Sequence, residues 1–440
     1  MHMKGSGEPL RFVKASSTVQ TVPTALQNDL SVDFARLDRR LADLAALGAI
    51  EGTEGCARLA LTDEDKAGRD LVLSWMNELG LEVMIDGIGN VIATTRGANG
   101  RPPVMCGSHI DTVRTGGRYD GNLGVLAGLE VIETVLSSEV TLDRPLAVAF
   151  FTDEEGARFP PDMLGSLVYV DGMALEAALE IEGIDGAQVG AELDRIGYAG
   201  PAPLPGLVPH AFVELHIEQG PVLEVDKSTI GAVTGVQGIS WQEVTVTGQS
   251  NHAGTTPMNH RRDPGFVAAS CVAFVRSMAA DLGTPQVATV GRLELQPNLV
   301  NVVPATACFT VDLRNTDEVV LCEAEQRFSA FLREATAAEG CTFETRSLAR
   351  FEPVAFDDRL VSLVEETAKM LGHRVQRLPS GAGHDAQMLA RVCPTAMIFT
   401  PSKDGISHNP AEYTTPADLE AGANVLLQVM MTLATEAVVA

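Results

Sequence analysis

Closely spaced cysteines are missing from this sequence. Its 440 residues contain seven cysteines, and none of them belongs to a Cys-x-x-Cys pair. An odd number of widely separated cysteines argues against a disulfide framework, because such frameworks use even numbers at close spacing. We therefore expect reduced, mostly buried thiols in a cytoplasmic protein.

Long apolar runs and an excess of positive charge are missing as well. No stretch approaches about 18 uninterrupted apolar residues, and residues 1–9 lack the apolar segment of a signal peptide, so we expect no membrane association. The formal net charge of -26 at pH 7 argues against nucleic acid and anionic membrane as partners. This charge is compatible with a small substrate whose own charge is met inside a pocket.

The length and the hydrophobic pattern predict two domains, because 440 residues exceed one ordinary core. Residues 1–30 show no clean periodicity and are expected to form a loose tail. From residue 31 onward, helical patterns alternate with short apolar runs, as at 103–107 and 146–152. This alternation predicts an α/β domain with a largely buried sheet, made of residues 31–224 and 336–440.

Residues 225–335 follow a different pattern. Strand-like stretches at 232–246, 286–295 and 307–315 are separated by a helical stretch at 264–282, and a second helical stretch follows at 318–338. This order predicts a small α+β unit inserted into the larger domain.

Side chains that bind metals follow several of the apolar runs. The sequence has only nine histidines, so their positions are informative. The candidate ligands and their neighbours are His109, Asp111, Asp120, Asp153, Glu154, Glu155, His216 and His408. Three acidic residues at the exit of a buried strand repel one another unless cations compensate them. Imidazoles combined with carboxylates suit Zn, Mn, Co or Ni.

Each of these features has an ordinary structural alternative. A lone histidine after a strand is more often structural than a ligand, and an acidic triplet is usually a solvated helix N-terminus. The glycine-rich loop around Asp120 could be a simple turn, since Asp-Gly is a turn dipeptide. Because so many ligand-type residues follow strands of one predicted sheet, where ligands usually collect, we favour a metal site.

Five longer motifs resemble those of the amidase, hydantoinase/carbamoylase family, a branch of the M20 metallopeptidase superfamily. They are Gly-Ser-His-Ile-Asp-Thr-Val (107–113), Thr-Asp-Glu-Glu-Gly-Ala-Arg-Phe (152–159), Glu-Leu-His-Ile-Glu-Gln-Gly-Pro-Val-Leu-Glu (214–224), Asn-His-Ala-Gly-Thr-Thr-Pro-Met (251–258) and Ser-Gly-Ala-Gly-His-Asp-Ala (380–386). That branch holds N-carbamoyl-L-amino acid hydrolases, β-ureidopropionases and allantoate amidohydrolases. The resemblance covers roughly residues 31 to 435.

The resemblance implies an aminopeptidase-like catalytic domain that binds two divalent metal ions, with helices flanking a mixed sheet. The inserted unit at 225–335 would be a ferredoxin-like lid and dimerisation domain, so a homodimer is expected. One metal would be held by His109, Asp120 and His216, and the second by Asp120, Glu155 and His408. Asp111 would orient His109.

The same resemblance implies the catalytic and substrate-binding residues. Glu154 would be the general base, and His252 would donate a hydrogen bond to the oxyanion. Gln219, Asn301, Arg314 and His384 would contact the substrate, with Arg314 matched to its carboxylate. We expect Asn301 and Arg314 on neighbouring strands. A salt bridge from Arg314 to Asp312 or Asp317 is the structural alternative.

The leading hypothesis is hydrolysis of an N-carbamoyl-L-amino acid or N-carbamoyl-β-amino acid to the amino acid, CO2 and ammonia. Allantoate amidohydrolase is the close alternative, because allantoate also joins a ureido group to a carboxylate. An N-acyl amino acid or dipeptide hydrolase is a third. From other classes, an inactive binding protein on this fold would lack Glu154 or a ligand, and none is lost. A nucleotide-binding protein is disfavoured, since no GxGxxG or P-loop pattern opens a helix.

Overall fold

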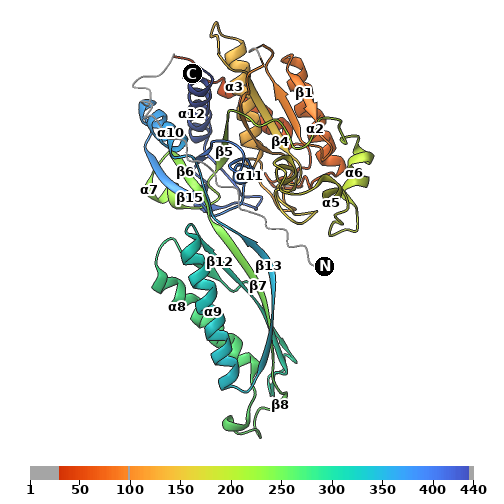
Figure 1. Ribbon diagram of the computed structural model, residues 1–440, viewed down its shortest axis with the longest axis vertical. Coiled ribbons are helices and arrows are strands. Elements are labelled where there is room, and N and C mark those ends of the chain that lie inside the picture. The colour runs from red at the N-terminus through yellow and green to blue at the C-terminus, as the bar shows by residue number, and fades with distance from the viewer. Residues whose placement is uncertain (1–28, 98–99, 436–440) are drawn as a thin grey trace, which may run out of the picture.

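Two separate β-sheets organise the chain in the computed structural model, which describes residues 29–97 and 100–435. The larger sheet lies in a broad α/β unit and the smaller one in an elongated unit that projects from it (Figure 1). The predicted tail at 1–30 falls outside the described residues, apart from residues 29 and 30.

The large sheet is mixed, with the order β1-β2-β4-β3-β5-β16-β6-β14 and with β15 paired to β6. Its strands are β1 (Glu82–Ile85), β2 (Val91–Thr94), β3 (Val104–His109), β4 (Leu146–Phe151), β5 (Ala211–Ile217), β6 (Ile230–Val236), β14 (Val354–Ala355), β15 (Val375–Ser380) and β16 (Thr395–Thr400). The central strands β4, β3, β5 and β16 run parallel to one another, and every residue in them is buried. Continuous apolar strands of this kind need helices on both faces of the sheet.

Helices cover the large sheet. They are α1 (Phe34–Ala45), α2 (Asp63–Glu78), α3 (Asn122–Leu136), α4 (Leu164–Tyr169), α5 (Leu175–Leu179), α6 (Val189–Ile196), α7 (Val222–Asp226), α10 (Asp358–Met370), α11 (Asp385–Leu389) and α12 (Pro416–Thr435). The central helices α3 and α12 pack on each other and on β3 and β5, and α11 packs on β5. The Thr62 side chain caps α2 by accepting from the Asp65 N–H, as its sequence position predicts.

The small sheet is antiparallel, with the order β10-β12-β7-β13 and with β9 paired to β12. Its strands are β7 (Gly238–Thr247), β9 (Val287–Thr289), β10 (Leu293–Gln296), β12 (Thr306–Asn315) and β13 (Thr342–Phe351). Burial alternates along β12, because helices α8 (Pro264–Leu282) and α9 (Glu318–Ala338) cover only one face. At the far tip, the short strands β8 (Asn251–His252) and β11 (Val302–Val303) pair (Figure 1).

The mixed α/β fold class is confirmed, and the two long helices of the small unit occupy their predicted ranges. The boundaries predicted at 225 and 335 do not coincide with the change of sheet. The single stretch predicted at 232–246 is two strands, of which β6 belongs to the large sheet, and β13 extends the small sheet to Phe351. We propose residues 237–353 as the inserted unit, because β6 and β14 pair with each other on the large sheet.

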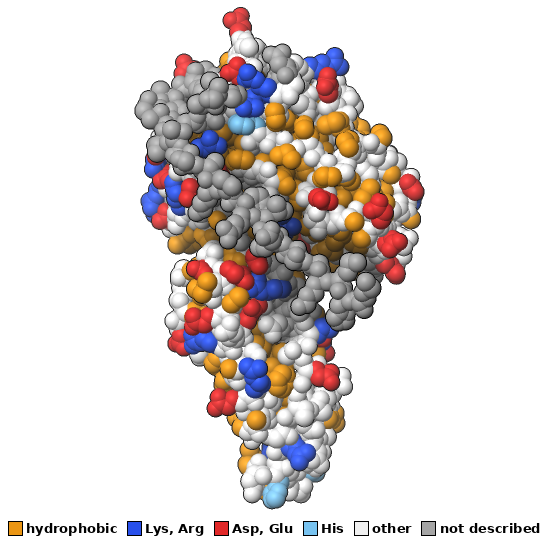
Figure 2. Space-filling view, in the orientation of Figure 1, with side chains coloured by type: hydrophobic (Ala, Val, Ile, Leu, Met, Phe, Trp, Pro, Cys, Tyr) orange, Lys and Arg blue, Asp and Glu red, His pale blue; other side chains and the backbone are white. Residues whose placement is uncertain are grey.

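Figure 2 shows acidic and basic side chains interspersed over one face of both units. All seven cysteines are unpaired, and five of them are buried. Within the described part of the chain, α8 alone is long and apolar enough to cross a membrane by length and composition, and in this fold it packs against α9 and β12.

Candidate metal centre and active site

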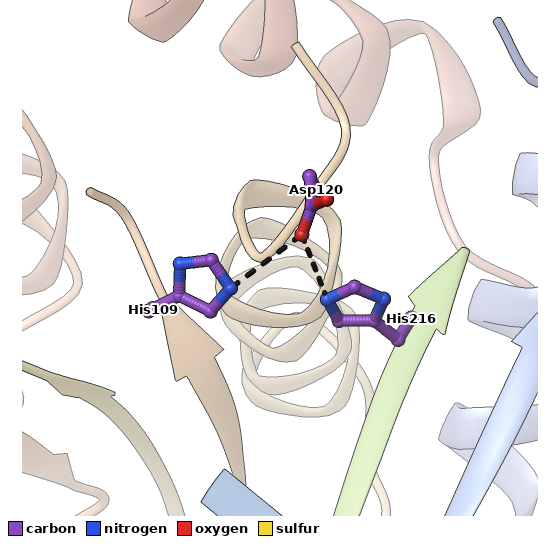
Figure 3. Close-up of side chains that lie close together, drawn as sticks. All are labelled: His109, Asp120 and His216. Atoms are coloured by element: carbon purple, nitrogen blue, oxygen red, sulfur yellow. Dashed lines mark ion pairs between the residues drawn. The ribbon is translucent and has the colours of Figure 1, made fainter. Parts of the chain in front are cut away.

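Two parallel strands and one loop bring together His109, His216 and Asp120 (Figure 3). His109 ends β3, His216 lies near the end of the neighbouring β5, and Asp120 comes just before α3. One carboxylate oxygen, Asp120 Oδ1, lies 3.6 Å from His109 Nε2 and 3.2 Å from His216 Nε2. All three side chains are buried. Parallel strands expose their carboxyl ends at one edge of a sheet, where ligands bind.

The other oxygen of Asp120 faces a second group of ligand-type residues. Asp120 Oδ2 lies 3.6 Å from His408 Nε2, and His408 Nε2 lies 3.1 Å from Glu155 Oε2. In each trio the candidate ligand atoms lie within 4.8 Å of one another. The five predicted ligand residues therefore form two adjacent groups that share Asp120.

The donor atoms fit divalent cations. Imidazole nitrogens and carboxylate oxygens are ligands of Zn and of neighbouring transition metals. Glu155 Oε1 is buried and has no hydrogen-bond partner, although a buried charged atom normally has one. A cation between these side chains would supply the missing partner.

Buried acidic groups outnumber cationic ones around this site. Burial raises the pKa of Glu154 well above its usual range, and His109 offsets this only in part. Burial also raises the pKa of Asp153 and of Asp385 well above the usual range of a carboxyl group. Burial alone would raise the pKa of Asp120, but hydrogen bonds with His109 and His216 hold it well below its usual range. An added positive charge would stabilise this cluster.

The local backbone is shaped to bring these groups close. Gly121 has φ +66°, and a Cβ atom there would lie 2.4 Å from the His109 ring, so the position requires glycine. The Gly121 N–H donates to His216 Nε2 at 3.1 Å. His408 also has a positive φ of 54°, which is unusual for a residue with a side chain and is common at functional sites.

Asp111 contacts both the His109 ring and the acidic segment that follows β4. Its two carboxylate oxygens accept from the Glu154 and Glu155 N–H groups, both at 3.3 Å. His109 Nδ1 lies 2.9 Å from the Asp111 carbonyl oxygen and 3.9 Å from the Asp111 carboxylate. The closer partner of the His109 ring is thus the backbone of Asp111. Glu154 and Glu155 point to different partners, since Glu154 Oε2 lies 3.3 Å from His109 Nε2.

Gln219 and His384 both lie beside the candidate ligands. Gln219 Nε2 donates to Asp120 Oδ2 at 2.8 Å, and the buried Gln219 Oε1 has no hydrogen-bond partner. The His384 ring is buried, packs edge-on against His216 and lies 2.8 Å from Ser380 Oγ. Burial lowers the pKa of His384 well below its usual range.

Arg314 lies on the open face of the small sheet, near the large unit. Its guanidinium forms an ion pair with Asp312, from 3.1 Å, and donates to the Gly381 carbonyl of the large unit at 2.8 Å. The salt bridge that the sequence left as an alternative is therefore present. The salt bridge and the hydrogen bond to Gly381 together use three of the five N–H donors of Arg314, so two donors have no protein partner.

His252 and Asn301 lie together at the tip of the small unit, away from the candidate ligands of the same chain (Figure 1). The Ala253 N–H donates to the Asn301 carbonyl at 2.9 Å. A histidine side chain is exposed at this tip (Figure 2). The expectation that Asn301 and Arg314 lie on neighbouring strands is wrong, because Asn301 precedes β11, which pairs with β8, whereas Arg314 lies at the opposite end of β12.

Glu412 and Ser407 hold the Asp120 loop, although no sequence motif marks either residue. Glu412 Oε1 accepts from the N–H groups of Tyr119 and Asp120, at 3.0 and 3.2 Å. Ser407 Oγ lies 2.8 Å from Asp120 Oδ2 and 3.1 Å from Glu412 Oε2. Burial raises the pKa of Glu412 to about 7. Both residues lie in a loop without a periodic pattern, almost 300 positions from Asp120, so only the fold reveals their role.

Comparison with known proteins gives consistent matches. A sequence model of the peptidase family M20/M25/M40 matches residues 105–432. An N-carbamoyl-L-amino-acid amidohydrolase of Rhizobium meliloti is 39% identical over 91% of this chain and 96% of its own length. An allantoate amidohydrolase of Escherichia coli is 36% identical over 90% of this chain and 97% of its own.

A solved structure agrees with the sequence matches. The amidase of the hydantoinase/carbamoylase family from Burkholderia multivorans superposes with a TM-score of 0.90 at 44% identity. The alignment covers 93% of this chain and 100% of that structure.

Proposed function

The chain belongs to the peptidase family M20/M25/M40, and we propose that it is a metal-dependent amidohydrolase that cleaves the ureido C–N bond of an N-carbamoyl amino acid. The products would be the amino acid, CO2 and ammonia. The observation that carries this proposal is the pair of candidate ligand groups that share Asp120, in a chain with relatives that are named N-carbamoyl-L-amino acid amidohydrolases. Allantoate is the second candidate substrate, because relatives of similar identity are named for it.

We propose that the site holds two divalent metal ions, either Zn or one of Mn, Co and Ni. His109, Asp120 and His216 would hold one, and Asp120, Glu155 and His408 the other. Bound there, the two ions would lower the pKa of a water molecule and polarise the scissile carbonyl.

Glu154 is the proposed general base. Its carboxylate is buried beside His109, while the adjacent Glu155 faces His408. Glu154 would take a proton from the attacking water and then pass it to the leaving nitrogen of the cleaved C–N bond. Asp111 would support both steps by fixing the backbone of residues 154 and 155.

The substrate carboxylate would bind Arg314, whose two remaining N–H donors match its two oxygens. Gln219 and His384 would contact the ureido end beside the ligand groups. His252 would donate a hydrogen bond to the oxyanion, and Asn301 beside it would help to position the substrate.

We further propose a homodimer in which the tip of one chain completes the site of the other. His252 and Asn301 lie at the end of the small unit farthest from the ligand groups of their own chain (Figure 1). An isologous dimer would let each tip reach the partner's cleft.

One panel experiment tests the function. The purified protein is incubated with N-carbamoyl amino acids, N-carbamoyl-β-alanine, allantoate and N-acetyl amino acids, and ammonia and free amino acid are measured. Ammonia together with the free amino acid from the carbamoyl compounds is expected, with close to two metal ions per chain in the same sample. Cleavage of the N-acetyl compounds alone would overturn the ureido specificity, and a metal-free active enzyme would overturn the metal proposal.

A further inference from the structure

A cavity of about 790 Å³ lies between the two units. Its size is within the range of pockets that hold small ligands. On the large unit it is lined by Gln219, Val222 and Leu378, and on the small unit by Pro285, Val287 and Arg314. The cavity therefore joins the residue that contacts Asp120 to the guanidinium proposed to bind a carboxylate.

Val287 lies directly beside Arg314 in this cavity. The two residues are cross-strand partners in the antiparallel pair of β9 and β12, so their side chains emerge on the same face of the small sheet. That face is the open one, because the buried side chains of β12 point towards α8 and α9. The Val287 side chain is 49% exposed, although it is apolar. An apolar surface thus adjoins the proposed carboxylate site.

The opposite wall is also apolar. Val222, at the start of α7, is 44% exposed and lines the same cavity three residues after Gln219. Val222 is held in place by its N–H, which donates to the buried Glu218 carboxylate at 2.7 Å. Exposed valines therefore face the cavity from both units.

We infer that Val287 and Val222 form the subsite for the substrate side chain, and that the preferred substrates are N-carbamoyl amino acids with apolar side chains. This inference rests on the proposed function. In an α-amino acid, the carboxylate and the side chain are attached to the same carbon atom. A carboxylate held by Arg314 therefore places the side chain within a few ångströms of Val287. Allantoate carries a second ureido group at this position, and the two valines offer its polar atoms no hydrogen bond.

A polar side chain in the same cavity could bind a ureido group, so allantoate must be tested beside the carbamoyl amino acids. Gln376 also lines the cavity, and its buried Oε1 has no hydrogen-bond partner. A ureido N–H could fill that position. The test must therefore measure allantoate together with a substrate that has an apolar side chain and one that has none.

The test is the ratio of kcat/KM for N-carbamoyl-L-leucine to kcat/KM for N-carbamoylglycine, with allantoate measured alongside. In the wild type we expect leucine to be favoured at least about tenfold, since apolar pocket contacts of this size discriminate by that order. Val287→Thr keeps the shape but replaces a methyl group with a hydroxyl, and should lower the ratio several-fold through a higher KM for the leucine compound. Val222→Ser should lower the ratio from the opposite wall.

Matched controls use exposed valines outside the cavity. Val319→Thr on α9 and Val225→Ser on α7 should leave the ratio unchanged, because both side chains are largely exposed and neither lines the cavity. Unfolding temperatures show that each variant is folded. An unchanged ratio in both cavity variants, or a wild type that prefers allantoate or the glycine compound, would overturn the subsite. A protein that hydrolyses none of the ureido compounds would overturn the proposed function itself.

Discussion

At the scale of single residues, the position of Asp120 is set from several distant parts of the chain. Its two oxygens face two different groups of ligand-type side chains. Gln219 and Ser407 donate to Oδ2, and Glu412 accepts from its N–H. Partners that fix a metal ligand in this way contribute to metal affinity even though they do not touch the metal.

Glu154→Gln should keep the fold and the metal content but lower kcat by about a thousandfold or more, because the amide has the same shape and cannot accept the proton. Ammonia release and metal analysis of the same sample check this. Glu176→Gln, at an exposed position on α5, is the matched control and should be fully active. A Glu154→Gln enzyme with near-normal turnover would refute the assignment of the base.

Glu412→Ala should weaken metal binding by roughly ten- to a hundredfold, because it leaves the N–H groups of Tyr119 and Asp120 without an acceptor and frees the Asp120 loop. Glu412→Gln keeps one oxygen and should restore most of the affinity. Competition with a chelator measures both variants, and Glu420→Ala on the exposed surface of α12 is the control. Equal affinity in Glu412→Ala and the wild type would show that the loop holds its shape without this residue.

The candidate ligands could be singled out from the sequence because they are histidines or carboxylates that lie at the ends of apolar strands or in the loops after them. Glu412 and Ser407 could not, since what marks them is proximity to Asp120 in space. The roles proposed for His252 and Asn301 come only from the resemblance to the family. Their distance from the ligand groups depends on how β8 and β11 are placed at the tip, which local sequence patterns do not encode.

At the scale of secondary structure elements, the turn between β1 and β2 is hydrogen-bonded to the segment that leads from β4 into the site. Asp86 accepts hydrogen bonds from the N–H groups of Ile88 and Asn90 and from the Asn90 side chain. Asn90 in turn accepts from the N–H of Thr152, the residue between the end of β4 and the acidic triplet. A buried carboxylate therefore organises the turn on which the exit of β4 depends.

This turn makes stability depend on pH. Burial raises the pKa of Asp86 from its ordinary 3.8 to about 6. The folded protein keeps this proton up to about pH 6 while the unfolded chain releases it near pH 4, so the free energy of unfolding falls as pH rises through that window. The contribution is at most roughly 3 kcal/mol.

Asp86→Asn cannot titrate, so its unfolding free energy should fall less than that of the wild type between about pH 4 and pH 6. Denaturant unfolding at several pH values compares the two slopes, and the exposed Asp43→Asn is the control. The slope is informative even though the variant loses one acceptor oxygen. Parallel profiles for Asp86→Asn and the wild type would contradict the raised pKa.

Elements with strong periodicity were predicted well, and the change of sheet was not. The helices α8 and α9 bury one side and expose the other, so their period is visible in the sequence. In the stretch at 232–246, β6 is buried almost throughout and β7 begins with three buried residues, so no change of burial pattern marks the passage from one sheet to the other. No sequence pattern marks the strand β13, because its charged and polar side chains are largely exposed at the edge of the sheet.

At the scale of the whole molecule, one chain does not assemble all the proposed active-site residues. The ligand groups, Gln219 and His384 lie in the large unit, and Arg314 reaches it through Gly381. His252 and Asn301 remain at the opposite end of the small unit (Figure 1). In the proposed dimer, His252 and Asn301 of one chain would act in the site of the partner chain.

Mixed dimers of two inactive variants test this arrangement. Co-expressed Glu154→Gln and His252→Ala chains should recover about a quarter of wild-type activity, since half of the random dimers are mixed and each mixed dimer has one intact site. Ammonia release by the unfractionated mixture measures this recovery, and mixed dimers isolated with two affinity tags should show about half of the wild-type activity. Pairing Glu154→Gln with His408→Ala, both on the large unit, should recover none. If the first pair also recovers none although mixed dimers form, His252 acts within its own chain.

The antiparallel pairing of β6 with β14 has a consequence for the history of this architecture. Val236 and Val354 are direct cross-strand partners, and the whole small unit is the connection between them. Replacing that connection with a tight turn would leave an ordinary β-hairpin, and the strand order of the large sheet would be unchanged. We therefore propose that the small unit is an insertion into a hairpin loop, where a module can be gained or lost while the strand order of the large sheet stays the same.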